Sequence, residues 1–232
     1  MSIVVPAVLP TSREDLLEKL ALFARISSVS RIQIDVVDGR FVTPASWPYT
    51  APAELQAMVK RGEMLPRLDC LEYEIDLMSL DAEEAAASWL ALGATRLTFH
   101  AETATDLPQQ LAATRKKYGS VVSFGLALNI ASDLALIEPC LDDIEYVQFM
   151  GIAKIGRQGQ PFDRRVFEKV HVFRNRHPDI PVQVDGGVSL PSARQLIALG
   201  VTNLVVGSGI LKAKNPSEAV AAFENLQGPY GV

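Results

Sequence analysis

The feature that most constrains the fold is a regular alternation of short β-branched or apolar runs with longer segments of helical periodicity. The apolar runs predict eight strands, at residues 3–9, 31–37, 70–78, 95–100, 121–128, 146–152, 181–187 and 203–209. Between them lie helical segments such as residues 12–26, with Ser12 as predicted N-cap, and residues 81–93, with Asp81 as predicted N-cap. No linker of low complexity interrupts the alternation, which predicts one domain over residues 1–232.

Eight βα units in a chain of 232 residues are the layout of a closed (β/α)₈ TIM barrel. A doubly wound open sheet also alternates, but its first strand is usually followed by a glycine-rich turn, and here that strand runs into "LPTS". We therefore predict a single (β/α)₈ barrel. In this fold the carboxyl ends of the strands face the active site, so polar residues at these ends are the first candidates for chemistry.

Composition and charge narrow the class of partner. The net charge is −5 and no basic stripe is present, which argues against nucleic-acid binding. No apolar run approaches the roughly 20 residues that span a bilayer, and the N-terminus lacks the pattern of a signal peptide, so a cytoplasmic protein without a membrane segment is expected. Cys70 and Cys140 have no CxxC spacing and are predicted to be core residues.

Carboxylates occur at the ends of three predicted strands. Asp35 lies inside "RIQIDVV", where strand alternation turns Gln33 and Asp35 together into the barrel mouth, and Asp76 and Asp185 occupy equivalent positions in "YEIDLM" and "VQVDGG". Three inward carboxylates repel one another unless a cation or shared protons intervene, which indicates a site. Asp38, directly before a glycine, is predicted to be a turn residue instead.

Glycines follow the last two predicted strands. "VDGGV" places Gly186 and Gly187 after the seventh strand, and "VVGSGI" places Gly207 and Ser208 after the eighth. Backbone N–H groups that are not covered by side chains can approach a phosphate, and the loops after strands seven and eight of barrels often form a phosphate site. These loops therefore predict a phosphorylated ligand.

The motifs together resemble the ribulose-phosphate 3-epimerase family. The family pattern HxDxMDGxFVPN is similar to "QIDVVDGRFVTP", TFHxE to "TFHAE", and GLALNP to "GLALNI". The HLM of the third strand resembles "DLM", and the GGQxF of the sixth loop resembles "QGQPF". VDGG and VxGS match "VDGG" and "VVGS". The resemblance covers the chain from "VVPAVLP" to the last helix, in order and spacing.

The resemblance implies inversion at C3 of a ketopentose phosphate through a 2,3-enediolate, with Asp35 and Asp185 as the paired acid and base. It implies a small phosphorylated sugar as partner and these residues for binding it: Gly159, Gly186, Gly187, Gly207, Ser208, Met78 and Met150. Members commonly form homo-oligomers. Trp47 and Tyr49, in the long loop after the second strand, are expected either to close over the sugar or to pack against a second subunit.

The metal site departs from the family pattern. Where the family binds its metal with two histidines and two aspartates, this chain carries Gln33, Asp35, Asp76 and Asp185. Oxygen ligands suit Mg²⁺ or Mn²⁺, so we do not expect zinc. A metal-free site is the open alternative, with the carboxylates sharing protons or partly neutralised by Lys154. Loop six carries Lys154 and Arg157 where the family has a proline-glycine turn.

The predicted function is a sugar-phosphate epimerase or isomerase. Two alternatives remain open: an aldolase that forms a Schiff base through Lys154, and a relative that binds phosphosugars without turnover. His100 lies at the end of the fourth predicted strand and is expected to be held by neighbouring groups, whereas His171 and His177 are expected at the surface.

Overall fold

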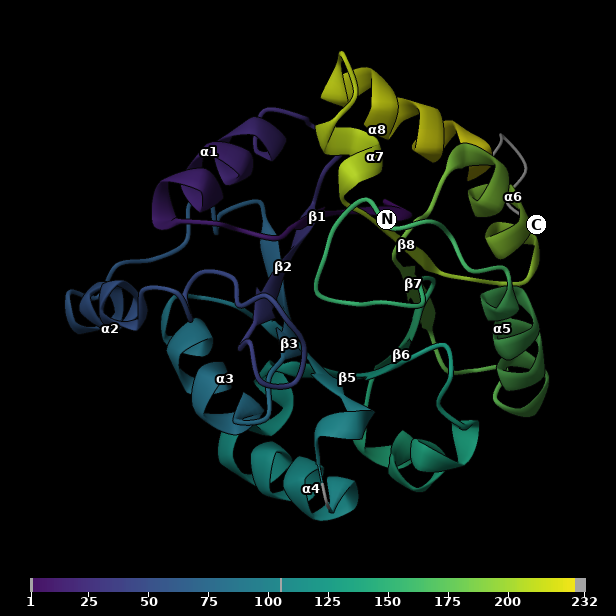
Figure 1. Cartoon of the computed structure of the whole chain (residues 1–232), viewed down its shortest axis with the longest axis horizontal. Helices are drawn as coiled ribbons and strands as arrows, with labels where there is room; N and C mark the ends of the chain where they lie inside the picture. Colours follow the sequence, from purple (N-terminus) through teal and green to yellow (C-terminus); the bar gives the residue numbers. More distant parts are fainter. Residues whose placement is uncertain (1, 105, 228–232) are drawn as a thin grey trace.

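The computed structural model describes residues 2–104 and 106–227, and over these ranges the chain forms a closed barrel of eight parallel strands (Figure 1). Each strand pairs with the next in the sequence, and β8 closes the barrel against β1. The strands are β1 (Val4–Val8), β2 (Arg31–Val37), β3 (Glu72–Met78), β4 (Arg96–His100), β5 (Ser123–Leu128), β6 (Tyr146–Met150), β7 (Val182–Asp185) and β8 (Asn203–Val206). The predicted fold class and its eight strands are confirmed.

Helices surround the barrel as an outer ring (Figure 1). They are α1 (Arg13–Phe23), α2 (Pro52–Lys60), α3 (Ala82–Ala91), α4 (Leu107–Tyr118), α5 (Arg165–Arg176), α6 (Leu190–Ala198), α7 (Ser208–Leu211) and α8 (Pro216–Glu224). Ser12 caps α1 as predicted, because its hydroxyl accepts a hydrogen bond from the Asp15 N–H at 3.1 Å. Asp81 occupies the N-cap position of α3 as predicted, but its side chain makes no capping bond and its carboxylate pairs with Arg40 instead.

The fifth unit lacks an α-helix within the described residues. Between β5 and β6 the chain forms two 3₁₀ turns, Leu134–Leu136 and Glu138–Asp143. Pro139 explains this departure from the regular βα layout, since a continuous helix over the segment would place a residue without an N–H in its interior.

Polar side chains fill much of the barrel interior. Strand register makes Gln33 the neighbour of Glu74, and Asp35 the neighbour of Asp76, across β2 and β3. Further buried polar residues face them from other strands, namely Thr98, His100, Gln148, Gln183 and Asp185. Barrels of this class usually fill this space with branched apolar residues. The large apolar core lies instead between the strands and the helices, where side chains such as Phe149 and Phe173 pack edge to face.

The aromatic loop after β2 belongs to this apolar core. Trp47 is 1% exposed and packs edge to face against Trp89, with ring centroids 5.9 Å apart. Its indole N–H donates to Glu54 at 2.9 Å, and the Tyr49 hydroxyl donates to Ser79 at 2.7 Å. The expectation is therefore wrong for Trp47, which is already covered within its own chain, whereas Tyr49 is half-buried and its predicted role stays a prediction.

The predictions for the two cysteines have different outcomes. Cys140 is buried, as predicted, whereas Cys70 is exposed, because it lies in the turn segment before β3 and not in the strand itself. Among the described residues, no helix combines the length and the apolar character that crossing a membrane requires.

The barrel interior yields a test of packing. A Cβ added at Gly125 would lie 2.2 Å from the Tyr146 ring, which carries the Arg96 guanidinium 4.1 Å from its centroid. We expect Gly125→Ala to lower the free energy of unfolding by about 1–3 kcal/mol, because the ring must leave its position. Urea denaturation measures this. The cost should shrink in a Tyr146→Leu background, and an equal cost in both backgrounds would contradict the predicted clash.

Candidate active site

Three carboxylates converge at the carboxyl ends of the strands. Asp35 and Asp76 are register neighbours on β2 and β3, and Asp185 is the last residue of β7. All three are buried, and each offers a carboxylate oxygen within 4.8 Å of those of the others. The strand alternation that the sequence indicates thus brings together residues that are far apart in the chain.

Burial determines the protonation of this cluster. Burial raises the pKa of Asp35 well above its usual value, and the negative charge of Asp76 raises it further. The pKa of Asp185 is raised by the same two effects, first burial and then the charges of Asp35 and Asp76. Within residues 2–104 and 106–227, no lysine or arginine forms an ion pair with any of the three. Asp35 and Asp185 therefore bind protons more tightly than ordinary aspartates do, because each is buried beside negative charge.

Gln33 lies between the two proposed acid/base residues. Its amide nitrogen lies 2.9 Å from Oδ1 of Asp35 and 3.3 Å from Oδ2 of Asp185, so it donates to both carboxylates. Its amide oxygen accepts from Gln183 at 3.3 Å. In this orientation Gln33 holds the two carboxylates through hydrogen bonds from its amide nitrogen. To bind a metal, the amide must rotate so that its oxygen faces the cluster, and this rotation breaks both hydrogen bonds.

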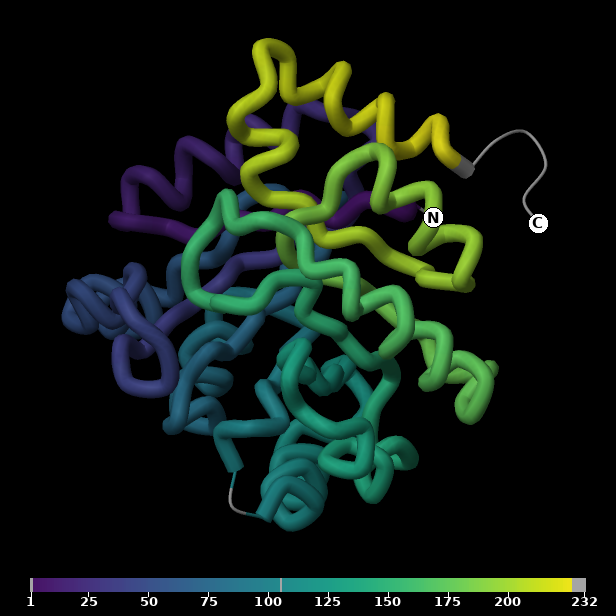
Figure 2. Tube along the Cα trace, turned by 45° about the vertical axis from the view of Figure 1, so that its right-hand side comes forward, coloured from purple at the N-terminus to yellow at the C-terminus, as the bar shows by residue number. Residues whose placement is uncertain are grey.

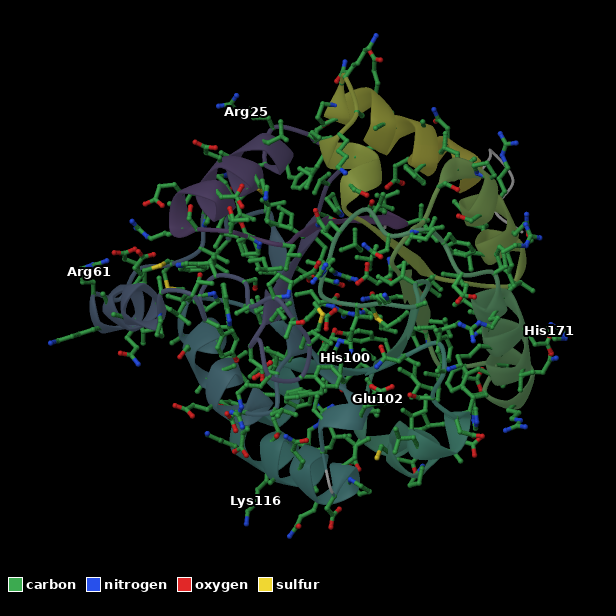
Figure 3. All side chains as sticks on the ribbon, in the orientation of Figure 1. Arg25, Arg61, His100, Glu102, Lys116 and His171 are labelled. Carbon is green, nitrogen blue, oxygen red and sulfur yellow. The ribbon has the colours of Figure 1, made fainter. Side chains whose placement is uncertain are left out.

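Both oxygens of Asp76 have partners. Nε2 of His100 lies 2.9 Å from Oδ1, and the Gln148 amide donates to Oδ2 at 3.0 Å. The prediction for His100 thus holds at one nitrogen only, since Nδ1 has no hydrogen-bond partner among the described residues and lies 3.9 Å from Oε2 of Glu102. Figure 3 places His100 and Glu102 well inside the outline of the molecule and His171 at its periphery.

A second polar layer lies beneath the cluster. Glu74 is fully buried but accepts from Arg96 at 3.0 Å and from Thr98 at 3.1 Å. Gln183 donates to Glu74 and, at 2.6 Å, to Gln148. Arg96 neutralises the charge of Glu74, and the two glutamine amides connect Glu74 by hydrogen bonds to the aspartates above it. Sequence reasoning missed this layer, although polar residues at alternate positions of β3 and β6 signal it.

One cavity, the inner cavity, contains the proposed reaction centre. Its lining includes every residue that the sequence assigns to acid/base work or to substrate binding: Asp35, Asp185, Met78, Met150, Gly159, Gly186, Gly187, Gly207 and Ser208. Asp76 and Gln33 do not line it and support the lining residues from behind. The carboxylates therefore face the same space as the glycine amides.

The glycines of this wall lie so close to neighbouring groups that a side chain at these positions would collide with them. A Cβ at Gly187, whose φ is +66°, would lie 2.7 Å from the Phe162 backbone. A Cβ at Gly207 would lie 2.5 Å from the amide nitrogen of Gln158. The Lys212 ammonium lies beside Gly159, 3.2 Å from where a Cβ would be. Glycines thus line this wall of the inner cavity, and the Lys212 ammonium lies beside one of them.

The segment after β6 arches over the barrel mouth, as the green loop in Figures 1 and 2 shows. The Gln158 amide donates to the Ala7 carbonyl at 3.2 Å, and Nε of Arg157 donates to the Thr43 carbonyl at 3.3 Å. The inner cavity has a volume of only about 50 Å³ beneath it. Gln158 lies at the glycine wall, so this loop must shift to admit a sugar phosphate. Sequence reasoning missed the role of Gln158.

Lys154 is exposed and does not line the inner cavity. It lines a larger outer cavity of about 780 Å³, formed by residues 41–43 after β2, residues 129–132 after β5 and residues within 153–160 after β6. In this position Lys154 does not share a cavity with the aspartates. The structure therefore supports neither the Schiff-base alternative nor the neutralisation of the aspartates by Lys154.

The pKa shifts give a test of the cluster in metal-free protein. A proton that the folded state binds more tightly than the unfolded state stabilises the fold fully below the unfolded pKa near 4, and this stabilisation is lost as the pH rises towards the raised folded pKa. Asp185→Asn has no titrating carboxyl at this position and so does not lose this stabilisation as the pH rises. We therefore expect its free energy of unfolding at pH 7 to be higher than that of wild type by at least about 1 kcal/mol. Thermal unfolding in chelator from pH 4.5 to 7.5 measures it, and a difference that does not narrow at low pH contradicts it.

Comparison with known proteins gives a family match. The model of the Ribulose-phosphate 3 epimerase family matches residues 3–211. The ribulose-phosphate 3-epimerase of Mycobacterium leprae is 28% identical over 232 residues, covering 97% of this chain and 95% of that protein. That of Schizosaccharomyces pombe is 25% identical over 194 residues, covering 84% of this chain and 80% of that protein.

Solved structures share the barrel. KGPDC from Streptococcus mutans superposes with a TM-score of 0.66 at 16% identity, covering 97% of this chain and 97% of that one. The 3-hexulose-6-phosphate synthase of Salmonella typhimurium gives a TM-score of 0.68 at 14% identity, covering 96% and 97%. At such identities these structures establish the fold alone. The family model, which matches residues 3–211, shows that the chain belongs to the ribulose-phosphate 3-epimerase family.

Proposed function

We propose that the protein is a ketose-phosphate 3-epimerase in which Asp35 and Asp185 exchange the C3 proton through a 2,3-enediolate. One observation carries the proposal: carboxylates from β2 and β7 line the same inner cavity as the glycine amides after β7 and β8. Epimerisation requires a base on one face of the carbon and an acid on the other. Two carboxylates on different strands meet that requirement.

The mutual repulsion of the two carboxylates supports this division of roles. Because burial and neighbouring charge raise both pKa values, the pair favours a state with one carboxyl protonated and one ionised. The ionised member removes the C3 proton, and the protonated member delivers a proton to the opposite face. Gln33 donates to both, so its amide holds the two oxygens in position in either direction of the reaction.

The rest of the inner cavity fits a sugar phosphate. Gly187, Gly207 and Ser208 line the inner cavity, where their N–H groups would bind a phosphate, with the Lys212 ammonium beside Gly159. Met78 and Met150 provide an apolar wall in a small cluster that also contains Val37 and Ile152. An apolar wall beside the reacting carbon excludes water from the enediolate.

The donor set fits a hard divalent cation. We propose that Asp35, Asp76 and Asp185 would hold Mg²⁺ or Mn²⁺, because the site offers carboxylate oxygens without an imidazole or thiolate. Such an ion, when bound, supplies Lewis-acid stabilisation of the enediolate oxygens. The metal-free form is the alternative, in which the shared protons described above neutralise the cluster.

A binding protein without turnover is the second candidate. The observation that favours it is the replacement of both histidines of the family metal site by Gln33 and Asp76, which leaves the phosphate wall intact while changing the reaction centre. Such a protein binds ketose phosphates but exchanges no hydrogen. Self-association stays an expectation from the family resemblance, now without a role for Trp47.

The acid/base assignment predicts hydrogen exchange. With ribulose 5-phosphate in D₂O, NMR should show deuterium entering C3, and Asp35→Asn or Asp185→Asn should slow this by about 10²–10⁴-fold. Asp38→Asn is the matched control, because Asp38 ends the same strand region but accepts from the N–H groups of Arg40, Phe41 and Leu80. Ligand-induced thermal stabilisation with no exchange would overturn the epimerase in favour of the binding protein.

The donor set predicts the metal preference. We expect Mn²⁺ or Mg²⁺ to raise the midpoint of thermal unfolding of chelator-treated protein, and we expect Asp76→Asn to weaken the apparent affinity about tenfold or more. Elemental analysis of purified protein complements this measurement. Stoichiometric zinc would contradict the predicted preference, and a lack of response to either ion would favour the metal-free form.

A further inference from the structure

The outer cavity has an unusual combination of charge and position. Its lining contains two cations, Lys154 and Arg157, together with the neutral polar side chains of Thr43, Asn129 and Gln160, and it contains no carboxylate. The whole chain carries a net charge of −5, so the positive charge of this cavity at the barrel mouth is opposite in sign to that of the whole chain.

Neither cation has an ion-pair partner among residues 2–104 and 106–227. Among the ion pairs of the described residues, Lys154 and Arg157 do not take part, whereas the buried guanidinium of Arg96 pairs with Glu74. Arg157 uses only its Nε, which donates to the Thr43 carbonyl. Its terminal NH groups therefore stay available, and a guanidinium fixed at one nitrogen presents them in a defined direction.

The outer cavity adjoins the inner cavity. Arg157 and Gln160 line both, so the segment after β6 borders the two spaces. The glycine wall lies at β7 and β8, whereas the outer cavity is bounded by the connections after β2, β5 and β6. A chain-like ligand with its phosphate at the glycine wall and its reacting carbon at Asp35 and Asp185 therefore directs its other end towards Arg157.

We propose that the outer cavity binds a second anionic group of the substrate, so that the preferred substrate is a phosphorylated sugar with a phosphate or a carboxylate at the end remote from the glycine wall. The assignment rests on the proposed function, because that function sets the direction in which the sugar lies. Arg157 would hold the anion by paired N–H donation, and Lys154 would add a second positive charge.

Three ligands that differ at the end remote from the 5-phosphate test the proposal. Ribulose 5-phosphate carries a hydroxyl at C1, ribulose 1,5-bisphosphate carries a phosphate there, and arabinonate 5-phosphate has a C1 carboxylate with a hydroxyl in place of the C2 carbonyl. We expect calorimetry to give a dissociation constant about tenfold or more lower for at least one doubly anionic ligand than for ribulose 5-phosphate, as a charge-assisted hydrogen bond provides. Which of the two binds more tightly identifies the anion.

Variants locate the effect. Lys154→Gln and Arg157→Gln should each weaken the doubly anionic ligand by about five- to tenfold and reduce its preference over ribulose 5-phosphate. Lys116→Gln is the matched control for net charge, because Lys116 is exposed in the last turn of α4, at the periphery in Figure 3. A preference that is absent, or that survives both variants, would overturn the second anion site.

The two proposals fail in different ways. Exchange at C3 of ribulose 5-phosphate without any preference for a doubly anionic ligand removes the outer site and leaves the epimerase. Tight, Lys154-dependent binding of a doubly anionic ligand, with no exchange in any ketose phosphate, removes the epimerase and leaves the outer site.

Discussion

The burial of negative charge along the barrel axis governs the rest of this structure. An ionised carboxylate in a protein interior costs several kcal/mol unless it is paired. Glu74 meets this requirement through Arg96, but Asp35, Asp76 and Asp185 sit above it without a basic partner among the described lysine and arginine side chains. The fold maintains this arrangement by surrounding the carboxylates with amide donors, which support the charge without cancelling it. A site built in this way requires protons or a cation from outside.

The two replaced histidines change the charge of the site more than its shape. Gln33 still donates to both neighbouring carboxylates, so a hydrogen-bond donor remains where the family has an imidazole. Asp76 replaces a neutral ligand by an anionic one and is held by His100 and Gln148. The donor set thus changes from two imidazoles and two carboxylates to three carboxylates and an amide. The additional negative charge and the loss of nitrogen ligands both favour a hard cation over zinc.

Sequence reasoning reached the features that depend on strand periodicity and failed where packing decides. Alternation along β2, β3 and β7 is a local property, and it correctly turned Asp35, Asp76 and Asp185 to one side of the barrel wall. Trp47 lies in an irregular loop, where no period indicates which way a side chain points, and contact with Trp89 buries it.

Other misses have the same origin. Asp81 precedes a helix as a cap would, but its carboxylate is drawn to Arg40 from another loop. Gln158 reaches the glycine wall only because the segment after β6 folds back over the barrel, and its bond to Ala7 joins residues that are 151 positions apart. The same segment separates the inner from the outer cavity and carries Arg157 on their shared boundary. A single loop therefore lies over the aspartates and borders both cavities, so our proposals predict that changes in this loop alter specificity while the proposed acid/base pair on the strands stays unchanged.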